Sequence, residues 1–261
     1  MADGQRDRLG ATAAAGLCLV AAVLLYHIPL ADTVAGDALH AALAAAAALV
    51  CLALAGGLRA KCGRAGRAAW ALGAVGLCLL AALASVTVPM ALGYEPAAFD
   101  LADKAFLLLV VALSCAATAV WEEVAFRGLG QDAVQDALGE GRGAALKAAC
   151  VCSAVFAILH MDQTGDAGQT ALRFVQVFLF GLAMAGLRFG ARGLVWPIAV
   201  HALYDLVCFV PASLAWQGDG WEMPASALSS VETSVSGIAA SLVFLLPAAV
   251  LACRGLAGEA K

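Results

Sequence analysis

The chain has 261 residues, of which 63% are hydrophobic and only 13% are charged, and its mean hydropathy is +0.91. A soluble globular domain carries roughly 25% charged residues, so the composition predicts an integral membrane protein. The formal charge is −4 at pH 7, with no basic tail and no basic patch that contains aromatic residues. These features exclude a nucleic-acid-binding protein.

Apolar segments of span length recur along the whole chain. A membrane-spanning helix needs about 20 predominantly apolar residues, because the hydrocarbon core is about 30 Å thick. The sequence therefore predicts an all-α, polytopic helix bundle that forms a single membrane domain over residues 1–261. The eight expected spans are 9–31, 38–58, 68–92, 104–125, 145–162, 169–190, 193–214 and, as the last, 235–253.

Residues 1–100 are expected to form scaffold helices. Small residues dominate them, as in "ALHAALAAAAALVCLALAGG", and small residues let helices approach closely in lipid. The first apolar run is about as long as a span, so we interpret it as a retained helix and not as a signal peptide. The nine cysteines lie mostly inside apolar runs, which favours packing over disulfides.

The loops alternate in charge, and this alternation predicts the orientation. The loop 59–67, "RAKCGRAGR", carries four basic residues, whereas the next loop, "GYEPAAFDLAD", carries none. Under the positive-inside rule the pattern predicts a multi-pass protein of the cell membrane with both termini cytoplasmic. The amphipathic segment 129–143, "LGQDAVQDALGEGRG", is expected to be an interfacial helix on the cytoplasmic side.

Three apolar stretches carry ionisable side chains: "TAVWEEVAFRGLG" (118–130), "FAILHM" (156–161) and "WPIAVHALYDL" (196–206). A charged side chain at the bilayer centre costs roughly 2.5–3.5 kcal/mol on insertion scales, so such residues usually mark a functional site.

Helical spacing suggests roles for these side chains. Glu123 and Arg127 are four residues apart, so they share a helix face and are expected to pair. Glu122 is rotated by about 100° from Glu123, so it can face a different cavity and act as a base. His201 and Asp205 also share a face, and His160 comes from a third helix.

Each of these features has a simpler interpretation. The Glu–Arg pair could be interfacial, a single histidine could be packed and hydrogen-bonded, and His201 with Asp205 could join helices. Buried acids and imidazoles also form proton relays in transporters, although no internal repeat supports that class here. Three such features in consecutive spans, with the groups that a hydrolase needs, favour an enzyme.

The motifs resemble those of the CPBP family of intramembrane proteases, which includes CAAX proteases and bacteriocin-processing enzymes and is also called Abi. The family pattern EExxxR, FxxxH and HxxxN or HxxxD is matched by "EEVAFR" at 122–127, "FAILH" at 156–160 and "HALYD" at 201–205. The resemblance covers about residues 104–210, the expected catalytic core. It implies an intramembrane endopeptidase that acts on a peptide or protein substrate, lipidated or not, at the bilayer.

The resemblance also implies roles for the residues. Glu122 with His160 would activate water, and His201 with residue 205 would stabilise the oxyanion. An ionised Asp205 cannot donate as the commoner Asn does, so it would be protonated, orient His201 or help to hold a metal. Glu122, His160 and His201 could form a zinc site, and the sequence does not choose between a metal-dependent and a metal-free mechanism.

Two further expectations follow. The fold could instead serve a non-proteolytic immunity or adaptor protein, in which these residues bind a partner. Counted from the cytoplasmic side, Glu122 is expected to lie at a shallow depth in its span and His160 deep in the next one. The two can meet only if the first of these helices continues past Arg127 or the second starts near Ala149.

Overall fold

The computed structural model describes residues 69–91, 101–139, 143–161, 167–190, 193–215 and 234–258, together with isolated positions between residues 16 and 53. The predicted span 9–31, most of the predicted span 38–58 and the basic loop 59–67 therefore lie outside the described residues.

Among the described residues, the regular structure comprises seven α-helices and one π-helical segment, as the all-α prediction requires. A helix satisfies every backbone polar group within one segment, which apolar surroundings demand. The elements are α3 (Ala69–Ala91), α4 (Leu101–Glu122), η1 (Glu123–Gly130), α5 (Gln131–Leu138), α6 (Ala144–Leu159), α7 (Ala167–Gly190), α8 (Val195–Ala215) and α10 (Val235–Gly258).

Four stretches of the described chain are long and apolar enough to cross a membrane, which supports a multi-pass membrane protein. They are Ala71–Pro89, Leu108–Leu138, Ala167–Gly190 and Val235–Ala257. Two shorter apolar helices, Ala144–Leu159 and Val195–Val210, accompany them. Six of the eight predicted spans thus correspond to helices, and the other two are those that lie largely outside the described residues.

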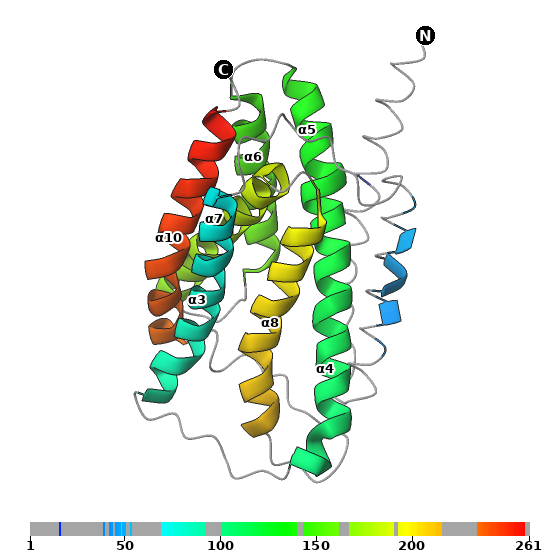
Figure 1. Cartoon of the computed structure of the whole chain (residues 1–261), viewed down its shortest axis with the longest axis vertical. Coiled ribbons are helices and arrows are strands. Elements are labelled where there is room, and N and C mark those ends of the chain that lie inside the picture. The colour runs from blue at the N-terminus through cyan, green and yellow to red at the C-terminus, as the bar shows by residue number, and fades with distance from the viewer. Residues whose placement is uncertain are drawn as a thin grey trace.

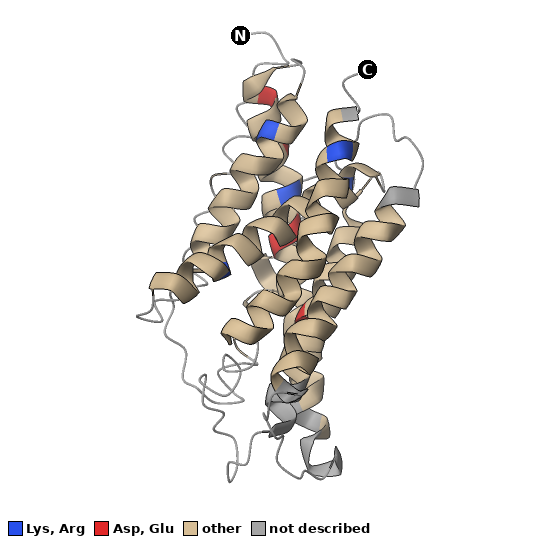
Figure 2. Cartoon of the chain, turned by 90° about the vertical axis from the view of Figure 1, so that its left-hand side faces the viewer, with Lys and Arg blue, Asp and Glu red and all other residues tan. Residues whose placement is uncertain are grey.

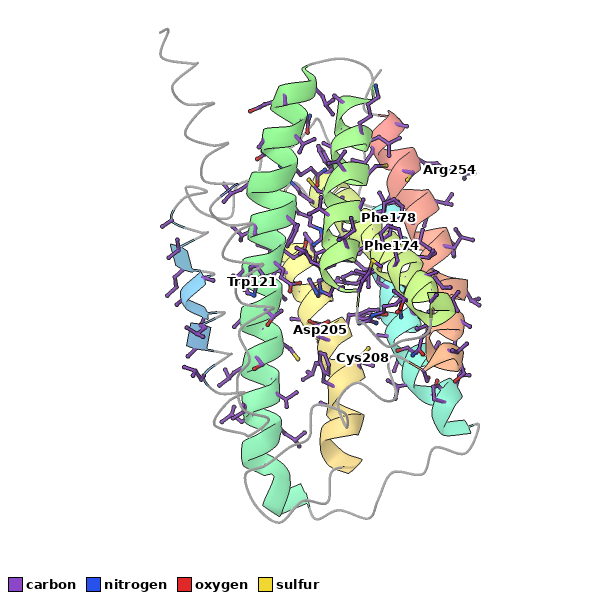
Figure 3. All side chains as sticks on the ribbon, turned by 180° about the vertical axis from the view of Figure 1, so that it is seen from behind. Trp121, Phe174, Phe178, Asp205, Cys208 and Arg254 are labelled. Carbon is purple, nitrogen blue, oxygen red and sulfur yellow. The ribbon has the colours of Figure 1, made fainter. Side chains whose placement is uncertain are left out.

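The helices form a bundle in which α10 packs against α3 and α7, α4 packs against α8, and α6 packs against α7 (Figure 1). Apolar side chains point outward from many of these helices (Figure 3). Leu109 and Leu113 on α4 and Val243 and Leu246 on α10 are more than half exposed, as lipid-facing side chains would be. The bundle therefore surrounds its polar groups with apolar helix faces.

The chain is helical without interruption from Leu101 to Leu138, because Glu122, Gly130 and Gln131 at the junctions all have right-handed helical dihedrals. Figure 1 shows α4 and α5 as one long rod. The predicted end of the span at residue 125 was therefore wrong. The helix predicted within 129–143 is present as α5, but it continues the rod. The charged residues that suggested a helix end lie inside the bundle, where partners from other helices surround them.

The turn after this rod is built on glycine. Gly139 follows α5 with a φ of 74°, and Gly143 precedes α6 with a φ of 78°. Side chains other than glycine rarely adopt these values, because the Cβ clashes with the backbone. The two glycines therefore set where α5 ends and where α6 turns back along the rod.

Candidate functional site

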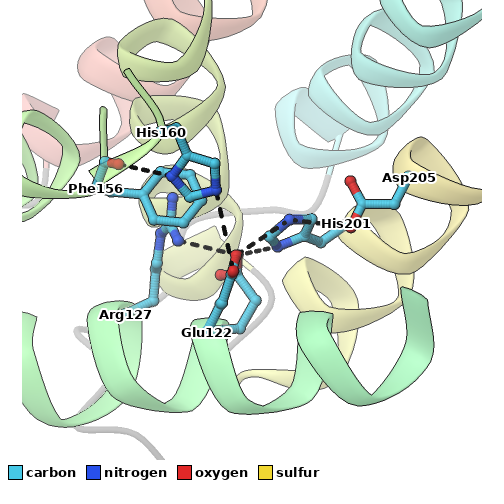
Figure 4. Close-up of polar contacts among 7 residues, drawn as sticks. Glu122, Arg127, Phe156, His160, His201 and Asp205 are labelled. Carbon is cyan, nitrogen blue, oxygen red and sulfur yellow. Dashed lines mark hydrogen bonds and ion pairs between the residues drawn. The ribbon is translucent and has the colours of Figure 1, made fainter. Parts of the chain in front are cut away.

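Four elements of the bundle bring the six predicted site residues together (Figure 4). Glu122 ends α4, Glu123 and Arg127 belong to η1, His160 follows α6, and His201 and Asp205 lie on α8. The predicted meeting of Glu122 and His160 is achieved because the first helix continues past Arg127. Helix α6 begins at Ala144, so the alternative of a late start was wrong.

Glu123 links Arg127 to His201. Its Oε1 atom lies 3.1 Å from Arg127 Nη1 and 2.8 Å from His201 Nδ1. The predicted ion pair is therefore confirmed, but its contact with His201 was not foreseen. Because a carboxylate can only accept, His201 Nδ1 carries the proton of this hydrogen bond.

The guanidinium of Arg127 is buried together with its partner. Arg127 is 1% exposed and Glu123 is fully buried, and the Arg127 guanidinium carbon lies 4.1 Å from the centre of the Phe156 ring. A cation over an aromatic face is attracted by the ring quadrupole. The ion pair and the ring together compensate two charges that burial would otherwise make very unfavourable.

Glu122 lies between the two imidazoles. Its Oε2 atom is 3.6 Å from His201 Nε2, and its Oε1 atom is 4.0 Å from His160 Nε2. Both separations exceed hydrogen-bond length, so they are electrostatic contacts. The side chain is 1% exposed. The rotation of Glu122 relative to Glu123 predicted that it could face a different cavity. It does not, because both glutamates contact His201, each at a different ring nitrogen.

The ring of His160 is held in one orientation where α6 ends. Its Nδ1 lies 2.8 Å from the carbonyl oxygen of Phe156, which can only accept, so Nδ1 donates. In the neutral ring, Nε2 is then an acceptor directed toward Glu122. The Phe156 ring, with its centre 4.2 Å from that of His160, supports this orientation.

Asp205 contacts His201 from the same helix. Its Oδ2 atom lies 3.5 Å from His201 Nε2, and the side chain is 18% exposed. The predicted sharing of a face by these residues is therefore confirmed. His201 Nε2 thus has two carboxylates beside it, Glu122 and Asp205.

A cavity of about 40 Å³ opens against this cluster. Its volume is enough for a few water molecules. The residues that line it are Phe156, His160, Arg173, Gln176, Val177, Phe180, His201, Tyr204 and Asp205.

Three polar residues of this cavity were missed by the sequence reasoning: Arg173, Gln176 and Tyr204. A signal was available, because Arg173 and Gln176 interrupt the apolar run "ALRFVQVFLF" three residues apart. Nothing in the chain order indicated that this face of α7 meets the histidines.

The cluster also contains groups that bind metals. Two imidazoles and a carboxylate are chemically suitable for zinc. As arranged, however, the described residues contain no group of three or more His, Cys, Asp or Glu side chains that could hold a metal ion. Glu122, His160 and His201 therefore do not fit a metal in this arrangement.

Comparison with known proteins agrees with the motifs. Residues 104–207 match the model of the family described as type II CAAX prenyl endopeptidase Rce1-like, and all six clustered residues lie in that interval. Neither the curated proteins nor the solved structures give a match. The chain therefore carries, over residues 104–207, a domain of the Rce1-like type II CAAX prenyl endopeptidase family, the CPBP family that its motifs resemble.

Proposed function

We propose that the protein is an intramembrane endopeptidase that hydrolyses a peptide bond of a membrane-associated peptide or protein. The observation that carries the proposal is the position of Glu122, which is buried between His160 and His201, two of the residues that line the cavity. Membership of a protease family supports it.

The first step is activation of water. A water molecule bound between Glu122 and His160, which lines the cavity, donates one hydrogen bond to the carboxylate and one to the neutral Nε2 of the ring. Glu122 takes a proton as the water oxygen attacks the peptide carbonyl carbon, which forms the new C–O bond. The π electrons of the carbonyl move to its oxygen and create an oxyanion.

His201 is placed to stabilise this oxyanion. Its Nδ1 proton is engaged by Glu123, so Nε2 donates only when the ring is doubly protonated. Asp205 orients the ring through its contact with Nε2 and, when protonated, adds a donor. The proton held by Glu122 then passes to the amide nitrogen, and the C–N bond breaks to release an amine and a carboxylic acid.

The domain organisation and topology form part of the proposal. Residues 1–100 would form a scaffold, residues 104–210 the catalytic core, and residues 235–253 the last of eight spans, with both termini cytoplasmic. Lys and Arg of the described part lie mostly toward the end of the bundle that holds α5 and the C-terminal end of α10 (Figure 2). The positive-inside rule assigns that end to the cytoplasm.

The proposal is tested by reconstituting the full chain in liposomes with a library of membrane-proximal peptides and identifying products by mass spectrometry. Wild type should cleave, and Glu122→Gln should lose about 10²–10⁴-fold in rate, as expected for loss of a general base. Asp136→Asn on α5 is the matched carboxylate-to-amide control and should remain active.

Three results would change the assignment. Full activity of Glu122→Gln would exclude Glu122 as the base. Activity that is lost with a chelator and regained with zinc would indicate a metal-dependent mechanism in place of the metal-free one proposed. If wild type cleaves no peptide, the protein is better explained as a non-proteolytic adaptor of the same fold.

A further inference from the structure

A second polar group lies on the cavity wall contributed by α7. The guanidinium of Arg173 donates from Nη1 to Gln176 Oε1 at 2.9 Å. The amide nitrogen of Gln176 donates to Ser241 Oγ at 2.8 Å and lies 3.5 Å from the hydroxyl of Tyr204. Three helices, α7, α8 and α10, therefore contribute to one hydrogen-bonded network.

The direction of this network is fixed by chemistry. Ser241 Oγ lies 2.7 Å from the carbonyl oxygen of Ile238, so the hydroxyl donates there and can only accept from Gln176. The amide nitrogen of Gln176 must then face Ser241, and its oxygen must face Arg173. Gln176 is 1% exposed and Ser241 is fully buried, so the orientation of the amide is protected from water.

Joining helices does not account for the whole network. The bond between Gln176 and Ser241 already connects α7 to α10 and needs no cation. A charged side chain in a membrane-spanning segment is unfavourable unless it has a role. Arg173 lies at the cavity end of the network, and among the described residues that line the cavity it alone carries a permanent positive charge.

We propose that Arg173, held by Gln176, is a specificity residue that binds a carboxylate of the substrate. The planar guanidinium matches a carboxylate in a two-bond geometry that an ammonium cannot reproduce. Arg173 shares the cavity with His160 and His201, so a carboxylate bound there would lie beside the residues proposed to act on the peptide bond. The carboxylate comes either from the C-terminus of the peptide or from an acidic side chain near the cleaved bond.

This inference takes its substrate class from the proposed peptidase function, but binding can be measured apart from cleavage. The probe is a fluorescent, lipid-anchored peptide without Asp or Glu, prepared with a free C-terminal carboxylate or as the C-terminal amide. A third probe is the amide with one internal Glu. Binding is measured to the full chain in lipid nanodiscs, with Glu122→Gln as the background so that the peptides stay intact.

The free acid should bind at least about tenfold more tightly than the amide. Hydrogen bonds to charged groups contribute a free energy of binding that corresponds to about a tenfold change in affinity or more. Arg173→Gln should abolish the difference, and Arg173→Lys should retain part of it. The matched control is Arg254→Gln, an exposed arginine on α10 that lies well away from Asp205 (Figure 3) and should leave the difference intact.

If the internal Glu restores tight binding to the amide, and Arg173→Gln removes that gain, a side chain supplies the carboxylate and the inference holds. Equal binding of all three probes overturns it, as does a preference that survives Arg173→Gln. Wild-type protein is then tested for cleavage of the same peptides. If the protein binds the free acid more tightly than the amide but cleaves neither, the peptidase function is refuted and the carboxylate site stands. If it cleaves the peptides without this binding preference, only the carboxylate site is refuted.

Discussion

At the scale of single residues, the two adjacent glutamates have different surroundings. Glu123 holds both Arg127 and the Nδ1 atom of His201 through one oxygen. The contacts of Glu122 to His160 and to the other nitrogen of His201 are longer. The first arrangement stabilises a buried cation and fixes a ring, whereas the second puts a carboxylate beside two imidazoles.

This difference predicts separate effects on folding. Glu123→Gln leaves the buried guanidinium of Arg127 without its counter-charge, and breaking a buried pair in this way costs about 3–5 kcal/mol. We expect a lower yield of folded protein after detergent extraction, measured by size-exclusion chromatography, than for Glu122→Gln. The double variant Glu123→Gln with Arg127→Gln should recover part of that yield. Equal losses for the two single variants would contradict the assignment.

Asp205 supports a second prediction at this scale. Its Oδ2 atom lies 3.5 Å from His201 Nε2 and the side chain lines the cavity. An asparagine keeps an oxygen that can accept from His201 and gains an amide that can donate to an oxyanion. We expect Asp205→Asn to retain most of kcat and, because Asn has no proton to lose, to extend activity to higher pH.

Asp205→Ala removes both abilities and should lower kcat by about 10²–10³-fold, as loss of an oxyanion-stabilising group does. The pair is compared by pH–rate profiles on one peptide. Unchanged activity in the alanine variant would mean that Asp205 contributes only to helix packing.

At the scale of the elements, the π-helical segment Glu123–Gly130 occupies the middle of the rod that begins with α4. Its residues Glu123 to Leu129 are all buried, so the charged face of the rod is enclosed by other helices. Wider turns of this type occur often at functional sites, because they redirect side chains without ending the helix. Here the rod passes the site and continues into α5.

Close contact between α7 and α10 supports a prediction about packing. A Cβ at Gly186 would lie 2.7 Å from Ala252 Cα, so the backbones of these helices would have to separate. Gly186→Ala should therefore destabilise the protein by about 1–3 kcal/mol and lower its Tm in detergent.

Gly76 on α3 provides the control, because a Cβ there would meet nothing within 4 Å. Gly76→Ala should leave the Tm unchanged or raise it, since alanine favours a helix over glycine. A similar decrease of Tm in both variants would contradict the prediction, because the destabilisation would then not come from contact between Gly186 and α10.

At the scale of the whole molecule, the alternation of charge along the loops predicts the topology. Cys62 and a cysteine placed at Gly218 should be labelled from opposite sides of the membrane by an impermeant thiol reagent in intact and opened cells. Both positions lie outside the described residues, so the prediction depends on the sequence alone. Labelling of both from one side would refute eight spans with both termini cytoplasmic.

The sequence alone determined the membrane class, the helical nature of six of the eight predicted spans and the two pairs at i and i+4. Each of these depends on local properties: apolar length, helical period and the distance between neighbouring turns. The six candidate residues could be chosen for the same reason, because an ionisable side chain in an apolar run is conspicuous wherever that run packs.

The tertiary structure decided which groups meet. Sequence spacing paired Glu123 with Arg127, but only the approach of α8 showed that Glu123 also holds His201. The packing of α7 against α8 and α10 likewise brought Arg173 and Gln176 to the cavity. Continuation of α4 through η1 was only one of two options at the sequence level, because charges suggest a helix end when the helices that surround them are unknown. Contacts between distant segments depend on packing, which local periodicity does not encode.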